Sequence, residues 1–164
     1  MKTSKRDLIL TVILTIASVG QIISAILLYD PGDSVFLINT GWIVLMFSAV
    51  FGWLPILTFR RKGKVKGRGY IHTTVLVSSG IYRIIRHPQY FAGVLIGIAL
   101  PMITQHLLVA ILGLIVVVTN YLNTYDEEKK CIEKFGEEYK QYMENVPRMN
   151  FFLGIIRLIK LKLK

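Results

Sequence analysis

A short polar stretch stands at the start of a long apolar run and carries residue types that can bind an anion. It contains Arg86, His87 and Pro88, with Tyr82 before it and Tyr90 after it. Proline suits the first position of a helix, and the residue before a proline is biased away from helical geometry. His87 is therefore predicted to cap a helix N-terminus, where free N–H groups and the positive dipole end can hold an anion. The same residues also fit an interfacial belt of tyrosine anchors and snorkelling arginines.

Two adjacent carboxylates, Glu127 and Glu128, form a second candidate constellation. Asn120, Asn123 and Thr124 precede Glu127 at helical spacing and form a polar stripe on an otherwise apolar helix end. Polar groups at membrane depth usually face a cavity, and an inward-facing carboxylate needs a partner because an unpaired buried charge is costly. The alternative is a pair of acidic residues exposed in the first turns outside the membrane.

The elements that must position these residues are membrane helices. Residues 8–29 and 35–59 contain no charged side chain, and a spanning helix needs about 20 such residues. Two shorter apolar blocks follow, residues 88–103 and 107–122, joined by the three residues 104–106. This pattern predicts two long spans and a tight helical hairpin.

The charge of the chain, formally +10, is concentrated beside these spans. Basic residues precede the first span, fill the segment after the second and close the chain. By the positive-inside rule both termini and the 60–87 loop are predicted to be cytoplasmic. Basic residues in such places favour contact with anionic lipid headgroups rather than with nucleic acid.

Two further segments complete the predicted organisation. Residues 73–77 are β-branched and too short for a helix, and a turn follows at 78–80, so this piece is a candidate wall for a polar site. After residue 122 an apolar face recurs at helical spacing up to Val146, which predicts an amphipathic cytosolic helix. Residues 151–164 alternate large apolar and basic side chains, a pattern typical of a helix on the membrane surface.

These elements predict an all-α polytopic membrane protein with about four transmembrane helices and a cytosolic C-terminal amphipathic helix. We expect one domain over residues 1–164, composed of two spans (1–59), a cytosolic basic loop (60–87), the helical hairpin (88–122), and the cytosolic helix with its membrane-surface tail (123–164). No phosphate-binding loop, HExxH motif or nucleophile elbow is present, and the three histidines lack metal-ligand spacing. We therefore expect no metal site.

The motifs, taken in order, resemble the isoprenylcysteine carboxyl methyltransferase-like family of integral membrane methyltransferases, to which phosphatidylethanolamine N-methyltransferases are related. The resemblance covers roughly residues 70–148. The matching residues are Thr74-Val75-Leu76-Val77, Gly80-Ile81-Tyr82, Arg86-His87-Pro88-Gln89-Tyr90, Glu127-Glu128, Phe135-Gly136-Glu137-Glu138-Tyr139, Tyr142 and Val146-Pro147-Arg148.

The resemblance implies methyl transfer from S-adenosyl-L-methionine to a membrane lipid or a lipidated substrate, with a carboxylate or an amine as the methylated headgroup. It implies that the cofactor pocket uses Thr74, Val75, Leu76, Val77, Tyr82, His87, Pro88, Gln89, Tyr90, Glu127 and Glu128. The catalytic candidates are Arg86, His87, Asn123 and Glu127.

One position departs from the family pattern. Isoprenylcysteine enzymes carry an arginine four residues before the first glutamate, where this chain has Asn123. Asparagine cannot form the charged bidentate pair that arginine makes with a carboxylate, which favours an amine or another lipid headgroup. An amine acceptor must lose a proton, for which His87 or Glu127 is the candidate base. Two other interpretations remain: a nicotinamide-dependent membrane reductase of related fold, and a non-catalytic four-helix membrane protein such as a transporter subunit or an assembly factor.

Overall fold

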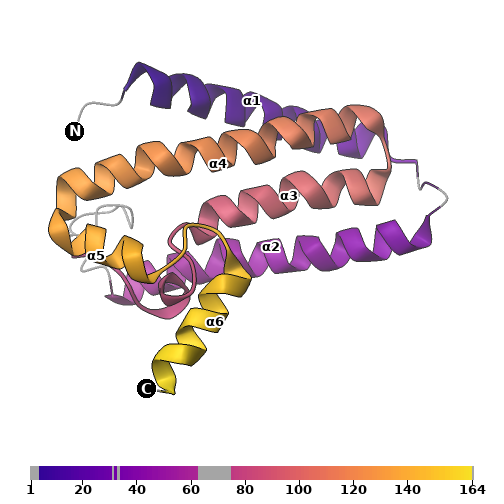
Figure 1. Ribbon diagram of the computed structural model, residues 1–164. Coiled ribbons are helices and arrows are strands. Elements are labelled where there is room, and N and C mark those ends of the chain that lie inside the picture. The colour runs from indigo at the N-terminus through magenta and orange to yellow at the C-terminus, as the bar shows by residue number, and fades with distance from the viewer. Residues whose placement is uncertain (1–3, 31, 33, 63–74, 164) are drawn as a thin grey trace. The chain divides into compact units, whose positions relative to one another are not determined.

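The computed structural model describes residues 4–30, 32, 34–62 and 75–163, and within them every regular element is helical (Figure 1). The predicted residue Thr74 lies outside the described residues, as does most of the basic segment before it. The elements are α1 (Lys5–Leu27), α2 (Val35–Lys62), the short 3-10 helix η1 (Gly80–Arg83), α3 (Pro88–Thr104), α4 (Leu107–Phe135), α5 (Glu137–Asn145) and α6 (Phe151–Lys162).

Three of these helices are long and apolar enough to cross a membrane, and α3 is a shorter apolar helix. α1 and α2 are the two predicted long spans. α3 and α4 form the predicted hairpin, and between them Gln105 adopts a left-handed backbone with φ 48°. The prediction of an all-α polytopic membrane protein is confirmed.

α4 continues further than the apolar pattern alone indicates. It has 29 residues and ends at Phe135, because neither glycine nor proline interrupts the charged segment that follows the apolar one. The break comes at Gly136, whose φ of 58° suits a residue without a Cβ. The single amphipathic helix predicted up to Val146 is therefore divided into the end of α4 and the separate helix α5.

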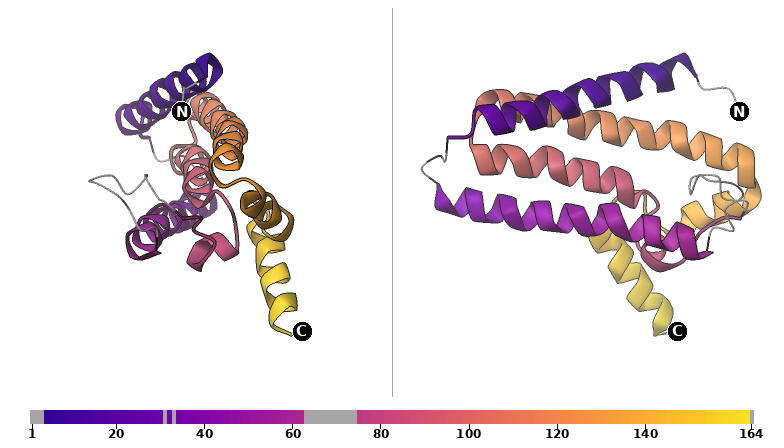
Figure 2. Two further views of the ribbon diagram at one scale, coloured as in Figure 1. Left: turned by 90° about the vertical axis from the view of Figure 1, so that its left-hand side faces the viewer. Right: turned by 180° about the vertical axis from the view of Figure 1, so that it is seen from behind.

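Residues 1–50 and 90–126 form one compact unit, in which α1, α3 and α4 lie side by side (Figures 1 and 2). Gln21 is fully buried in the middle of α1, and its Nε2 donates to the carbonyls of Gly97 at 3.1 Å and Val109 at 3.4 Å. A Cβ on Gly113 would collide with the Gly97 carbonyl, so these two glycines permit α3 and α4 to approach closely. Ser48 fastens α2 to α3 by donating to the Ala92 carbonyl at 2.9 Å.

Residues 51–89 and 127–164 form the second compact unit. Its buried centre is Tyr139, Tyr142 and Val146, which follow one face of α5 and its end, with partly buried apolar side chains of α4 packed against them. The residues before η1, 75–79, are not helical, in agreement with the prediction of an extended piece. Within this unit α6 begins beside α2 and inclines away from it (Figures 1 and 2).

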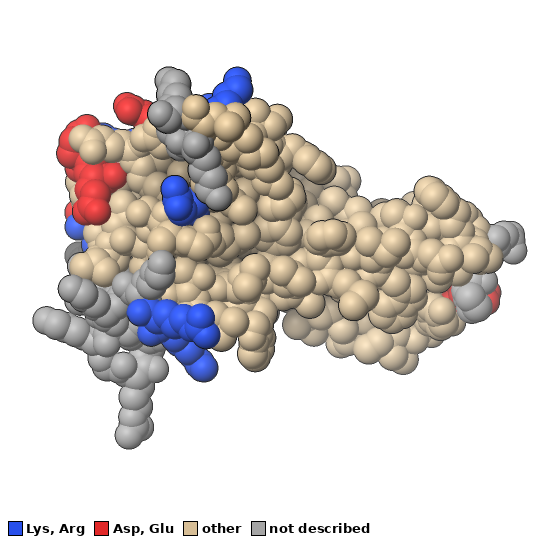
Figure 3. All heavy atoms as spheres, turned by 90° about the horizontal axis from the view of Figure 1, so that it is seen from below, with Lys and Arg blue, Asp and Glu red and all other residues tan. Residues whose placement is uncertain are grey.

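Most of the face seen in Figure 3 is uncharged, and the charged side chains gather towards its ends. Large apolar side chains are exposed along α1 and α2, among them Ile16, Ile26, Phe36 and Met46. Exposure of so many large apolar groups is expected when lipid, and not water, surrounds the helices.

Candidate functional site

The predicted site segment before α3 is held by the residues that follow α5. Pro88 is the first residue of α3, as its fixed φ predicts. The N–H of Arg86 donates to the Pro147 carbonyl at 3.0 Å, and the N–H of His87 donates to the Arg148 carbonyl at 3.2 Å. Two backbone hydrogen bonds thus place the two segments beside each other although about 60 residues separate them.

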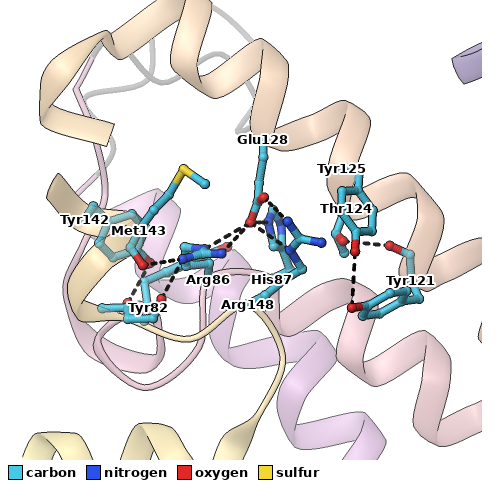
Figure 4. A network of polar contacts seen from close by, with 11 residues as sticks. Tyr82, Arg86, His87, Tyr121, Thr124, Tyr125, Glu128, Tyr142, Met143 and Arg148 are labelled. Carbon is cyan, nitrogen blue, oxygen red and sulfur yellow. Dashed lines mark hydrogen bonds and ion pairs between the residues drawn. The ribbon is translucent and has the colours of Figure 1, made fainter. Parts of the chain in front are cut away.

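A four-residue cluster of charged and polar side chains lies at this contact (Figure 4). The Glu128 carboxylate of α4 accepts hydrogen bonds from Arg86 Nε at 3.0 Å and Nη2 at 2.7 Å. It also accepts from Arg148 through Nε at 3.1 Å and through Nη2. The His87 Nε2 atom lies 3.2 Å from the same carboxylate. We call Arg86, His87, Glu128 and Arg148 the charge cluster.

The charge cluster is buried, which makes its pairing obligatory. The side chains of Arg86, Glu128 and Arg148 are only 8%, 5% and 20% exposed. Arg86 also uses Nη1 to donate to two carbonyls at the end of α5, those of Met143 at 2.6 Å and Val146 at 2.7 Å. Charge-assisted hydrogen bonds of this kind are the strong ones, and they offset the cost of removing the charges from water.

The charge cluster carries an excess of positive charge, because two guanidinium groups share one carboxylate. His87 adds no charge when it is neutral. Burial lowers the pKa of His87 below its ordinary value, and the hydrogen bond to Glu128 offsets part of that effect. Since an ionised carboxylate only accepts hydrogen bonds, the neutral imidazole carries its proton on Nε2.

Three tyrosines of the same unit support the charge cluster without ionising. The Tyr142 hydroxyl donates to the Tyr82 carbonyl at 2.6 Å and so fixes η1 against α5. Burial raises the pKa of the Tyr82, Tyr139 and Tyr142 phenols well above the ordinary tyrosine value. These side chains are therefore neutral packing and hydrogen-bonding groups at physiological pH.

The two adjacent glutamates have different environments. Glu128 lies inside the charge cluster, whereas the Glu127 side chain is 40% exposed and lies 3.9 Å from Lys130, one turn further along α4. Glu127 still lies close enough to raise the pKa of His87 through its charge. Glu127 is thus the carboxylate with an accessible face, and Glu128 is the one already occupied by arginine.

The remaining predicted residues divide between the two units. In the second unit Val77, Tyr82 and Pro88 are buried, Val75 and Leu76 are half-buried, and Gln89 is exposed. Tyr90 and Asn123 belong to the first unit. Arg86, His87 and Glu128 are thus in contact within the second unit, whereas Asn123 belongs to the first unit.

Asn123 is a buried polar residue with an unused acceptor. It is 4% exposed, and no donor among the described residues lies within hydrogen-bond distance of its Oδ1. Its neighbours on the polar stripe are satisfied locally, because Asn120 donates to the Val116 carbonyl and Thr124 to the Tyr121 carbonyl. A buried polar atom without a hydrogen-bond partner is rare.

Arg148 is a site residue that the search for catalytic groups in the sequence missed. It binds both oxygens of Glu128, yet it stands 20 residues after that glutamate and among the basic residues of the tail. The signal was the Val146-Pro147-Arg148 motif, which matched the family pattern without an assigned role.

Comparison with known proteins gives the chain a family. The profile of the family described as "Phospholipid methyltransferase" matches residues 36–138, more than half of the 164 residues. A methanethiol S-methyltransferase of Pseudomonas deceptionensis is 37% identical over 67 residues, which are 40% of this chain and 24% of that protein. The matched stretch thus spans about a quarter of the relative's length, and no solved structure matches. With its spans and its charge cluster at the start of α3, the chain belongs to the phospholipid methyltransferase family of membrane proteins.

Proposed function

We propose that the protein is an S-adenosylmethionine-dependent methyltransferase that acts at the membrane interface on a lipid-like or prenylated substrate. The observation that carries this proposal is the buried, positively charged cluster at the first turn of α3. Family membership supports methyl transfer as the reaction class. The printed name of the relative refers to a thiol acceptor, so thiols join amines and carboxylates as acceptor groups to be tested.

The chemistry of the described residues fits the parts of the cofactor. The excess positive charge of Arg86 and Arg148, beside the positive dipole end of α3, suits the methionyl carboxylate. The half-exposed Glu127 suits the cofactor's ammonium group or its ribose hydroxyls. Apolar side chains before and within η1, such as Leu76 and Tyr82, suit the adenine ring.

When bound, the cofactor supplies an electrophilic methyl group on its sulfonium. The task of the chain is to orient the acceptor and to exclude water, for which holding reacting atoms about 3–3.5 Å apart is the main source of rate. A carboxylate acceptor is already ionised and needs no base. For an amine acceptor, His87 or Glu127 removes the proton, and the lowered pKa of His87 keeps its imidazole in the neutral form that a base requires.

Asn123 supports an acceptor that brings its own hydrogen-bond donor. Its buried Oδ1 lacks a donor among the described residues, and satisfying such an atom is worth about 1–3 kcal/mol. An amine or a thiol supplies an N–H or S–H, whereas an ionised carboxylate presents only acceptors. We therefore propose an amine headgroup ahead of a carboxylate. We also propose, from the distribution of basic residues, that both termini face the cytoplasm.

The test uses the full chain reconstituted in phospholipid nanodiscs. Binding of S-adenosylhomocysteine is measured by calorimetry, and transfer of a radiolabelled methyl group is measured with amine, thiol and carboxylate acceptors of matched chain length. Glu127→Gln is expected to weaken S-adenosylhomocysteine binding at least tenfold. Glu133→Gln is the matched control, because Glu133 is an exposed residue of the same helix. Absence of both binding and transfer in the unsubstituted protein would refute the proposal.

A further inference from the structure

The last helix, α6, starts against α2, nine residues before the first basic residue of α2. The Phe151 ring at its first residue packs edge-on against the Phe51 ring of α2, with centroids 5.2 Å apart. Three residues later, a Cβ on Gly154 would collide with the Ile84 carbonyl, so the first turn of α6 is held tightly within its unit. The Asn150 side chain accepts from the Leu153 N–H at 3.0 Å and caps the helix at this point.

The depth of this starting point follows from α2. Phe51 precedes Arg60 by nine residues in a continuous helix, which corresponds to about 13 Å at 1.5 Å per residue. Arg60 and Arg61 are the first charges after the span and therefore mark the headgroup level. Because the headgroup region outside the core takes up only several of these 13 Å, the Phe51–Phe151 contact is expected to fall within the hydrocarbon on that side.

The direction of α6 leads back towards the headgroups. In Figure 1 and the right-hand view of Figure 2, α6 runs mainly away from α2, with a smaller component towards the Lys62 end of that helix. α6 has 12 residues, or about 18 Å of length, and part of that length is directed towards the level of Arg60. Its first six residues are uncharged, and Arg157 and Lys160 come in its second half.

The exposed face of α6 is apolar along its whole length. Phe152 is 77% exposed, Ile156 and Ile159 are each 51% exposed, and Leu163 just after the helix is 81% exposed. These residues lie at helical spacing on one side, and Trp53 of α2 is likewise 65% exposed. The occupant of this face is therefore the bilayer.

We infer that α6 is an oblique helix inserted in the bilayer leaflet on the Arg60 side, with its N-terminus in the hydrocarbon and its basic end among anionic headgroups. This geometry differs from a helix that lies flat on the membrane surface.

The experiment measures the depth of single probes on the full chain. Cys131, the one cysteine of the sequence, is replaced by serine, and a cysteine carrying an environment-sensitive fluorophore is introduced in turn at Phe152, Ile156, Ile159 and Leu163. The protein is reconstituted in vesicles of equal parts phosphatidylcholine and phosphatidylglycerol, and quenching by lipids with nitroxides at defined depths is recorded. A probe at Trp42, exposed on α2, gives the deep reference, and a probe at Glu138, exposed on α5, gives the aqueous one. Only variants with the same melting temperature as the Cys131→Ser parent are compared.

The expected result is a graded series, with the Phe152 probe deepest and the Leu163 probe shallowest, separated by about 10 Å or more. Equal depths at Phe152 and Leu163 would show a helix lying flat and would overturn the inference. Quenching of all four probes by aqueous iodide to the level of the Glu138 probe would show a helix in water and would also overturn it. Replacing Arg157 and Lys160 together by glutamate is expected to raise iodide quenching at Leu163 several-fold and to leave the Phe152 probe unchanged. No change at Leu163 would refute the role of anionic headgroups.

Discussion

The neighbouring glutamates of α4 offer a decisive test, because adjacent residues of the same type have opposite environments. Replacing Glu128 by alanine removes the one carboxylate that Arg86 and Arg148 share. Replacing Glu127 by alanine removes a side chain that is 40% exposed and only 3.9 Å from Lys130. Both changes delete the same atoms from the same helix, so differences in helix propensity cancel.

The expected losses of unfolding free energy follow from how deeply each glutamate is buried. Breaking a buried ion pair by removing one partner costs about 3–5 kcal/mol, because the remaining charge stays buried and unpaired. In Glu128→Ala two guanidiniums are left facing each other, so we expect the upper half of that range. An exposed pair contributes about 0–1 kcal/mol, and we expect no more than this for Glu127→Ala.

The assay is thermal unfolding of the full chain in one detergent, followed by circular dichroism. With about 2–4 °C of melting temperature per kcal/mol for a chain of this size, Glu128→Ala is expected to melt about 8–20 °C below the parent and Glu127→Ala within about 4 °C of it. Arg148→Ala is measured alone and combined with Glu128→Ala. The combined loss is expected to be smaller than the sum of the two, since both remove the same interaction.

Two outcomes would contradict this reasoning. If Glu127→Ala and Glu128→Ala have the same melting temperature, the charge cluster does not stabilise the second unit. If the losses of Glu128→Ala and Arg148→Ala add without coupling, the two side chains do not depend on each other. Glu128→Gln separates charge from shape, and it is expected to fall between the parent and Glu128→Ala.

Further perturbations test other parts of the fold. Burial lowers the pKa of His87 in the folded chain, so below the ordinary histidine pKa of about 6.5 the unfolded chain binds more protons than the folded one. The stability that depends on neutral His87 is therefore present above that pH and is lost as the pH falls below it. His87→Gln is expected to flatten the fall in melting temperature between neutral and mildly acidic pH, and an unchanged slope would exclude His87 as the source of that fall. Gly154→Ala places a Cβ against the Ile84 carbonyl and is expected to cost about 1–3 kcal/mol of unfolding free energy by overpacking, whereas a neutral result in the same melting assay would show that α6 can shift. Gly113→Ala forces α4 away from the Gly97 carbonyl of α3 and is expected to lower the melting temperature by a similar amount, and an unchanged value would mean that these helices do not pack closely.

Part of the fold of this protein can be predicted from local sequence. The lengths of uncharged segments predicted the two long spans and the short hairpin, since the bilayer sets how many apolar residues a span needs. Pro88 predicted local geometry in the same way, because a proline suits a helix start. The break at Gly136, where φ is positive, was not predicted. The family motifs pointed to the segment around His87 and to the glutamate pair.

The assignment within that site needed the tertiary structure. Periodicity placed Glu127 on a polar stripe, and only the fold shows that Arg86 and Arg148 converge on the adjacent Glu128. The partner of a buried charge depends on contacts between segments far apart in the chain, which no local pattern encodes. The orientation of α6 has the same origin: its alternating apolar and basic residues predicted a helix on the membrane surface, and our inference of an oblique helix rests on the contact of Phe151 with Phe51.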